Sequence, residues 1–451
     1  MFQKLNSYRQ IVYDISKLAL PITIGQLGLV LMGASDVVML GKYNTLAMSS
    51  AGFGNSVFFL FMLLGIGTMY AVSTITSIVD GENKPEQAIP IFFSSLKVAL
   101  LLSVILIGVN LWMCENLGFF KQSPEMTKLG KEYLSIVTWS VPALLFFNSG
   151  KQLLDGLSRT QASMYITFIG LALNIVLNYV LIYGKLGFSE MGLTGAAWAT
   201  VISRFAMAFM MLAVAWYHPL MKELKKKTHV AKSYFMEILK IGVPVGFTFF
   251  FEIAAFSIAM IFAGQISNTH SAAHQIAISL ASVTYMFVTG IAAAGNIVVG
   301  NHYGAHDAIG LRRSGLAAIL LTIVIESFFA MVFLLFNDML PELYTSDAEL
   351  LRMTPSLVIL AAFFQLSDGL QAVAAGVLRG IKDTKISSVI AFVSYWLLMT
   401  PGAYYLCFYT SMGINGIWLA FVLGLSFAAI LLLYRIHKKS KEIIATNRFE
   451  D

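Results

Sequence analysis

The sequence predicts an all-α integral membrane protein with twelve transmembrane helices in two pseudo-symmetric lobes of six helices. Three observations predict this class: long apolar runs, an uneven distribution of Lys and Arg, and an internal repeat. Of the 451 residues, 58% are hydrophobic and 12% are charged, and the mean hydropathy is +0.76. A soluble domain carries about twice that charged fraction. Because lipid offers the backbone no hydrogen-bond partners, continuous apolar runs of about 20 residues predict helices.

Twelve apolar runs are long enough to cross a bilayer. The first, from about Ile11 to Leu40, is too long for the apolar core of a secretory signal, so we expect it to be retained as a span. In chain order the predicted spans cover about 13–40, 46–79, 88–115, 128–157, 161–184, 192–217, 235–265, 270–300, 309–337, 347–378, 384–409 and 413–436. Several are longer than a single crossing requires, so we expect tilted helices or extensions beyond the bilayer.

The distribution of Lys and Arg predicts the orientation of the spans. With the N-terminus in the cytoplasm, the cytoplasmic segments hold 21 of the 30 Lys and Arg residues, and the opposite side holds 6. The other three, Lys97, Lys151 and Arg204, fall within apolar runs. This bias predicts an even number of spans and two cytoplasmic termini.

The two halves of the chain resemble each other. Four short motifs recur in the same order and at a nearly constant offset: Pro21 with Pro244, Gly65-Ile66-Gly67 with Gly290-Ile291-Ala292, Asp155-Gly156-Leu157-Ser158-Arg159 with Ala375-Gly376-Val377-Leu378-Arg379, and Gly192, Gly195 and Ala199 with Gly413, Gly416 and Ala420. Since six is even, both copies enter the bilayer from the same side, a parallel repeat that transporters use. We therefore predict an N-terminal lobe over 1–217, a basic cytoplasmic linker over 218–234, and a C-terminal lobe with a cytoplasmic tail over 235–451.

Four acidic residues lie deep within predicted spans: Asp36, Glu252, Glu326 and Asp368. An ionisable residue at the bilayer centre costs about 2.5–3.5 kcal/mol on insertion scales, so it is a functional candidate by default. Glu252 and Asp368 lie near mid-span with no basic residue one helical turn away. Because desolvation disfavours a charged carboxylate, such groups could exchange protons or, where oxygens converge, hold Na⁺. The alternative is a neutral carboxyl bonded to a neighbouring helix, and the isolated Glu326 ranks lower for this reason.

Two amides and two prolines could support this chemistry. Asn174 and Asn178 are four residues apart and share one helix face. They could hold helices together or, with Asp36 in the same half, line a polar cavity. Pro21 and Pro244 interrupt helix hydrogen bonding near the start of the first and seventh spans. Each is either a static kink or a hinge.

The sequence gives little support for a disulfide, a metal site, nucleotide or nucleic-acid binding, or catalysis. Cys114 and Cys407 form no disulfide framework, and the i, i+4 histidine pairs (His270 with His274, His302 with His306) lack a third metal ligand. The Gly-Lys dipeptides at 41–42, 130–131, 150–151 and 184–185 are not followed by Ser or Thr, so we expect no nucleotide binding. The net charge of +6 fits a membrane surface better than a nucleic acid. No nucleophile or metal constellation indicates an enzyme, and we expect no cofactor.

The pattern resembles the MATE family of multidrug and toxic compound extrusion transporters over nearly the whole chain. The motifs that carry the resemblance are LALPITIGQ followed by ASDVVMLGK, SAAHQIA, LDGLSR with AGVLRGIKDT, and the pair GLTGAAWAT and GINGIWLA. Glu252 in the seventh span and Asp368 in the tenth match the acidic pair of the NorM-type branch. The chain also has the first-span acid, Asp36, on which the DinF-type branch depends, so candidate cation sites stand in both lobes.

The resemblance implies two six-helix lobes around a central cavity. It also implies a secondary antiporter that exports cationic amphipathic drugs by alternating access, driven by Na⁺ or H⁺. The implied coupling residues are Glu252, Asp368 and Asp36, with Na⁺ as a candidate ligand of the first two. We expect a monomer in a bacterial inner membrane. The alternative function is a flippase for lipid-linked precursors from the same exporter superfamily, although acidic rather than basic mid-span charges disfavour anionic lipid substrates.

Overall fold

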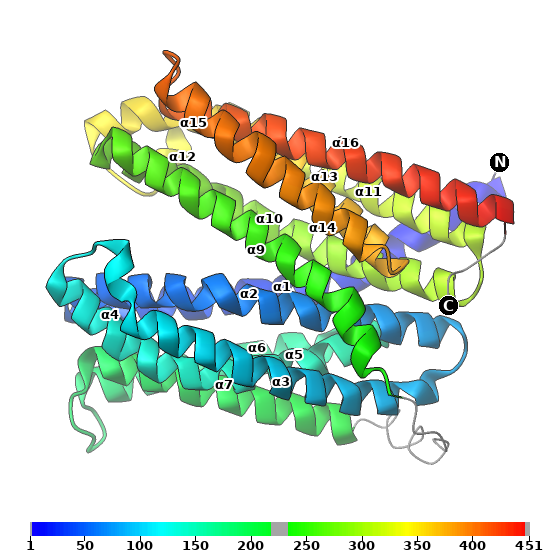
Figure 1. The fold of residues 1–451 in the computed structure, drawn as a ribbon, viewed down its shortest axis with the longest axis horizontal. Coiled ribbons are helices and arrows are strands. Elements are labelled where there is room, and N and C mark those ends of the chain that lie inside the picture. Colours follow the sequence, from blue (N-terminus) through cyan, green and yellow to red (C-terminus); the bar gives the residue numbers. More distant parts are fainter. Residues whose placement is uncertain (1, 218–232, 447–451) are drawn as a thin grey trace. The chain divides into compact units, whose positions relative to one another are not determined.

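The computed structural model describes residues 2–217 and 233–446, which are almost entirely helical and contain no strand (Figure 1). The main helices are α1 (Phe2–Tyr43), α2 (Thr45–Gly81), α3 (Ala88–Glu115), α4 (Pro124–Val137), α5 (Val141–Gly156), α6 (Gln161–Tyr183), α7 (Gly192–Tyr217), α9 (Phe235–Ile266), α10 (Asn268–Gly304), α11 (Ala308–Leu335), α12 (Met339–Glu342), α13 (Ala348–Gly380), α14 (Thr384–Phe392), α15 (Thr400–Phe408) and α16 (Ile414–Thr446). Short 3₁₀ turns η1 (Pro85–Gln87), η2 (Leu117–Phe120) and η3 (Thr138–Ser140) and the π-helix η4 (Val393–Met399) connect or interrupt them. Most of the predicted linker, including Lys222 and Lys225, lies outside the described residues.

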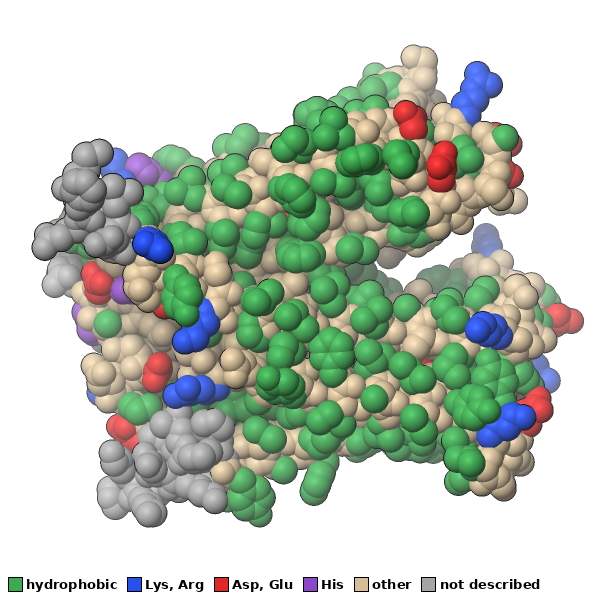
Figure 2. Space-filling view, turned by 180° about the vertical axis from the view of Figure 1, so that it is seen from behind, with side chains coloured by type: hydrophobic (Ala, Val, Ile, Leu, Met, Phe, Trp, Pro, Cys, Tyr) green, Lys and Arg blue, Asp and Glu red, His purple; other side chains and the backbone are tan. Residues whose placement is uncertain are grey.

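Eleven described helical segments are long and apolar enough to cross a membrane, which confirms the predicted class. The remaining predicted span, 128–157, consists of α4 and α5 joined by the turn η3. Pro142 stands in the first turn of α5, where its missing N–H is tolerated. Figure 2 shows hydrophobic side chains along the helices and charged side chains toward their ends on the face in view. An apolar surface with charged side chains toward the helix ends suits a multi-pass membrane protein.

The chain forms two compact units. The N-terminal unit is Ile24–Gly246, and the C-terminal unit is Phe247–Asp451 together with Met1–Thr23. Both boundaries fall inside a helix, two residues after a proline: after Pro21 in α1 and after Pro244 in α9. The boundaries are therefore separated by the same offset as the two prolines of the repeat. The predicted lobes assign α1 and α9 whole, and that division of the chain stays a prediction.

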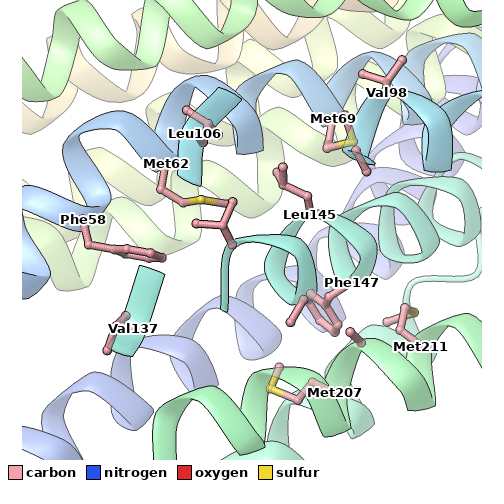
Figure 3. Packing of buried hydrophobic residues seen from close by; sticks show 14 of the residues in the cluster. Phe58, Met62, Met69, Val98, Leu106, Val137, Leu145, Phe147, Met207 and Met211 are labelled. Carbon is pink, nitrogen blue, oxygen red and sulfur yellow. The ribbon is translucent and has the colours of Figure 1, made fainter. Parts of the chain in front are cut away.

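The core of the N-terminal unit is aliphatic and rich in methionine. Met62 and Met69 of α2, Leu145 of α5 and Met211 of α7 are fully buried (Figure 3). The core of the C-terminal unit is more aromatic: the rings of Phe364 in α13 and of Trp418 and Phe421 in α16 lie within 5.9 Å of one another, centre to centre. Such packing holds α13 against α16 by area burial and edge-to-face contacts.

The repeat is visible in the backbone at the start of α7 and α16. Gly192 and Gly413 both have a φ of +54°, where a side chain would be strained. Three residues on, a Cβ added to Gly195 would lie 2.6 Å from the carbonyl oxygen of Leu181 in α6, and one added to Gly416 would lie 2.7 Å from that of Leu406 in α15. These glycines let each helix pack directly on the backbone of the preceding one, in the same way in both halves.

Candidate functional site

Glu252 lies in the interior of the C-terminal unit, 6% exposed, on the face of α9 that meets two tyrosines. The hydroxyl of Tyr285 in α10 donates to its Oε1 at 3.1 Å, and that of Tyr395 donates to its Oε2 at 3.4 Å. Tyr395 belongs to the π-helix η4, a kind of distortion that often marks functional positions. Two hydroxyl donors orient both carboxyl oxygens without neutralising their charge.

Asp368 is 5% exposed in α13, the helix that packs most extensively on α10. The side-chain amide of Gln371, three residues further along the same face, donates to its Oδ1 at 3.3 Å. Gln371 also interacts with the Glu252 carboxyl, and the charges of Glu252 and Asp368 are close enough to repel each other. The structure therefore brings the two predicted acids together around one amide. Among the described residues, neither carboxyl has a Lys or Arg partner.

Glu326 of α11 is 1% exposed, and both of its carboxyl oxygens lack a hydrogen-bond partner within the described part of the chain. Its stem fills the space left by Gly369, where an added Cβ would lie 2.8 Å from the Glu326 Cγ. The Glu326 charge would reach Asp368, the residue next to Gly369. A buried carboxyl without partners is better accommodated as the neutral acid, which supports its lower rank as a coupling residue.

Asp36 lies in a hydrogen-bonded network of the N-terminal unit. The amide of Asn178 in α6 donates to its Oδ1 at 2.5 Å, and the hydroxyl of Thr200 in α7 donates to its Oδ2 at 3.1 Å. Asn178 also donates to the Asn174 Oδ1 at 3.2 Å, which in turn accepts from the hydroxyl of Ser35 at 3.1 Å. The structure thus joins Asp36 to both predicted amides in one network of hydrogen bonds between α1, α6 and α7.

The two prolines occupy matching places. Pro21 lies inside α1 between Ala19 and Thr23, which pack against Gly290 of α10 in the C-terminal unit. Pro244 lies inside α9, where Gly246 on the other side of the same turn packs against the Leu64 backbone of α2 in the N-terminal unit. Each proline therefore stands in a helix segment held by close packing, just before the helix enters the other unit.

Sequence reasoning missed Tyr285, Tyr395, Gln371 and Thr200. A tyrosine in a span is common, so neither Tyr285 nor Tyr395 gave a signal by itself. Gln371 could have been found, because it lies one turn from Asp368 on the same helix face. Thr200 ends the motif GLTGAAWAT, eight residues after Gly192. Pro401, six residues after Tyr395, is a sequence feature that could have indicated the irregular helix around it.

The arrangement suits the binding of a single monovalent cation better than metal chemistry. The described residues contain no group of three or more His, Cys, Asp or Glu side chains placed to hold a metal ion. Cys114 and Cys407 are buried and free. What both units offer is a carboxylate whose oxygens are oriented by neutral donors inside a helical bundle. Such a site can accept a proton or a small cation and release it again.

Comparison with known proteins decides the family. The family model described as MatE matches residues 21–180 and 244–405, one segment in each half of the repeat. The chain belongs to the MatE family. Similar MatE proteins include a probable multidrug resistance protein NorM of Xanthomonas campestris pv. campestris, 32% identical over 95% of this chain and 94% of the relative. NorM of Vibrio vulnificus is 31% identical over 97% of this chain and 98% of the relative.

Solved MatE structures share the fold. The eukaryotic MATE transporter AtDTX14 superposes with a TM-score of 0.88 at 18% identity, covering 98% of this chain and all of the other. An outward-facing MATE family transporter of the MOP superfamily superposes with a TM-score of 0.84 at 23% identity, over 96% of each chain. As a MatE protein the chain is a multi-pass membrane transporter of the NorM type and not an enzyme, as predicted.

Proposed function

We propose that the protein exports cationic amphipathic compounds in exchange for Na⁺ or H⁺. The observation that carries the proposal is the pair Glu252 and Asp368, buried around Gln371 without a basic partner in the described chain. Multidrug resistance in the names of the NorM relatives supports the substrate class. The acidic character of this site disfavours an anionic lipid precursor as the substrate.

Charge competition would couple the two movements. A carboxylate pair that binds a drug cation is stabilised less by a coupling cation at the same time, so each ligand lowers the affinity for the other. Entry of Na⁺ or H⁺ would neutralise the pair and release the drug outward. The two units would then return to the inward state, because each ligand favours the conformation that binds it better.

We further propose that the transporter works as a monomer in a bacterial cytoplasmic membrane with both termini inside. The bias of 21 Lys and Arg residues against 6 supports this orientation. A reporter that matures only in the cytoplasm, fused to either terminus, tests it.

Proteoliposomes with imposed gradients test the antiport. The purified protein is reconstituted, and uptake of a fluorescent cationic dye is followed with a Na⁺ gradient alone, a pH gradient alone, or neither. We expect the dye to accumulate when one of the two ion gradients is imposed, and not to accumulate when neither is imposed. Lipid-linked sugar pools that change on deletion of the gene, with unchanged drug resistance, would favour the flippase instead.

A second test concerns the prolines, which we propose to be hinges. Pro21 leaves the Lys17 carbonyl without its helical N–H partner, so α1 bends there at low cost. Pro21→Ala restores this hydrogen bond and should slow transport several-fold while equilibrium dye binding is kept. Pro244→Ala gives the matched comparison in α9. Unchanged turnover in both variants would contradict hinge function and leave two static kinks.

A further inference from the structure

The π-helix η4 interrupts the span Thr384–Phe408, and two residues at its end account for its wide turn. Pro401 has no backbone N–H, and in a regular α-helix its ring would clash with the carbonyl four residues back. Directly before it, the Thr400 N–H bonds to the Tyr395 carbonyl oxygen, five residues back, and the Thr400 hydroxyl donates to the same oxygen at 2.7 Å. The two donors of Thr400 thus close the wide turn that Pro401 imposes.

The helices on either side of η4 are fixed against α9 (Figure 1). Phe392, the last residue of α14, meets Phe251 with ring centres 5.2 Å apart. Beyond η4, Tyr404 of α15 meets Phe262 with ring centres 5.4 Å apart. Glu252 directly follows the first of these contacts in α9, and the hydroxyl that η4 contributes reaches its Oε2. The wide turn therefore lies opposite this carboxyl rather than elsewhere along the span.

Of the polar side chains in η4, Tyr395 is the one that finds a partner within the described chain. It is fully buried and donates to Glu252. The hydroxyl of Ser394 and the ring N–H of Trp396 are also buried, and neither has a hydrogen-bond partner among the described residues. Leaving such groups unpaired is costly. The turn therefore satisfies the one polar group that meets the site acid at the expense of its two neighbours.

The other half of the repeat has an unbroken form of this helix. α6 precedes α7 as α14, η4 and α15 precede α16, and the glycines at the start of α7 and α16 pack on the preceding helix in the same way. α6 contains no proline and is a regular α-helix over Gln161–Tyr183. The interruption therefore belongs to the half that holds Glu252, as expected of a feature that serves this carboxyl.

We propose that Pro401 and Thr400 are positioning residues that maintain the wide turn of η4. This turn aims the Tyr395 hydroxyl at Glu252 and so orients one oxygen of the cation site. An α-helix advances about 100° per residue, so relaxation of η4 to a regular α-helix would rotate Tyr395 about the helix axis and withdraw its hydroxyl. Glu252 would then keep one hydroxyl donor, Tyr285. The inference rests on the proposed function, because this hydrogen bond affects transport only if Glu252 takes part in coupling.

Infrared spectroscopy of the purified full-length transporter tests this role. At acidic pH the band of the neutral Glu252 carboxyl is assigned by its loss in Glu252→Gln, and loss of a hydroxyl donor moves such a band to higher wavenumber. Tyr395→Phe should move the band, and Pro401→Ala should move it equally although the tyrosine is present. The double variant should move it no further. Pro355→Ala is the matched control, because it removes a proline from α13 of the same unit, outside η4, and should leave the band in place.

Transport should follow the same pattern. Ion-driven dye export should fall about tenfold in Tyr395→Phe and in Pro401→Ala, because each variant removes the same hydrogen bond to a carboxylate. The two variants combined should lose no more than either alone, since residues that act through one interaction are not additive.

A Glu252 band that stays in place in Pro401→Ala but moves in Tyr395→Phe would overturn the proposal, and so would a band that Tyr395→Phe leaves in place. Should Pro401→Ala not purify as a single species, Thr400→Val replaces it. This variant keeps the shape of the side chain, loses the hydroxyl bond that closes the turn, and should move the band in the same direction; an unmoved band would again overturn the proposal. Normal export by Glu252→Gln would instead contradict the proposed coupling site and leave the infrared result unchanged.

Discussion

Glu252→Gln is expected to lower cation-driven export at least about 100-fold with little change in protein abundance. The amide keeps the size of the side chain, and its oxygen can still accept from one of the two tyrosines that bond the carboxyl, Tyr285 or Tyr395. It cannot alternate between a charged and a neutral state, so neither a drug cation nor a coupling cation is stabilised. A 100-fold loss corresponds to about 2.7 kcal/mol at 1.36 kcal/mol per tenfold. Dye uptake in proteoliposomes, normalised to reconstituted protein, measures it.

The chain offers a matched control in Glu326→Gln. Glu326 is as buried as Glu252 and lies in the same unit, but the described chain gives its carboxyl oxygens no hydrogen-bond partner. If it is already neutral, the amide changes its chemistry little, and export should stay within about twofold of the wild type. Normal export by Glu252→Gln would exclude this residue from coupling. Equal losses in both variants would indicate that any buried carboxyl in this unit is needed for folding.

The acids of the site could be predicted from the sequence, and their partners could not. A carboxylate in an apolar run is conspicuous because it is costly there, so Glu252, Asp368 and Asp36 stand out without any structure. Tyr285 and Tyr395 do not, because tyrosine suits a span whether or not it meets a carboxyl. Only the packing of α9, α10 and η4 shows that their hydroxyls converge on Glu252.

The helices were predictable from hydropathy, and their breaks were not. The run 128–157 was predicted as a single span, although it holds five charged residues, and the turn η3 divides it into α4 and α5. The repeat predicted equivalent helices, and the matching φ of Gly192 and Gly413 follows from it. It did not predict that the compact units divide α1 and α9, since hydropathy has the same sign on both sides of Pro21 and Pro244.

Asp155 is another residue whose surroundings could not be predicted from the sequence, because it belongs to a buried ion pair. The sequence places it at the end of a predicted span, where an acid is unremarkable. In α5, however, it is 2% exposed, and its Oδ2 accepts from the Nζ of Lys151 at 2.7 Å. The hydroxyl of Ser163 in α6 lies 3.5 Å from its Oδ1. Two full charges one helical turn apart therefore share the interior of the N-terminal unit.

Lys151→Met is expected to destabilise the folded protein by about 3–5 kcal/mol, because it leaves the Asp155 charge buried without its partner. Asp155→Ala should destabilise the folded protein by a similar amount, because it leaves the Lys151 ammonium group buried without its partner. Denaturant unfolding in detergent, followed by tryptophan fluorescence, measures both. Variants as stable as the wild type would show that water or lipid headgroups reach this position and screen the remaining charge.

The repeat supplies the double variant that separates charge pairing from packing. At the offset that relates Arg159 to Arg379, Lys151 and Asp155 correspond to Gln371 and Ala375 of α13, so the C-terminal half occupies these places without a charge. Lys151→Gln combined with Asp155→Ala copies that solution and should recover most of the stability lost in Lys151→Gln alone or Asp155→Ala alone. Losses that simply add would mean that each side chain stabilises the unit by packing alone. Recovery would mean that the two charges balance each other within the N-terminal half; in the C-terminal half the equivalent Gln371 donates to Asp368 instead.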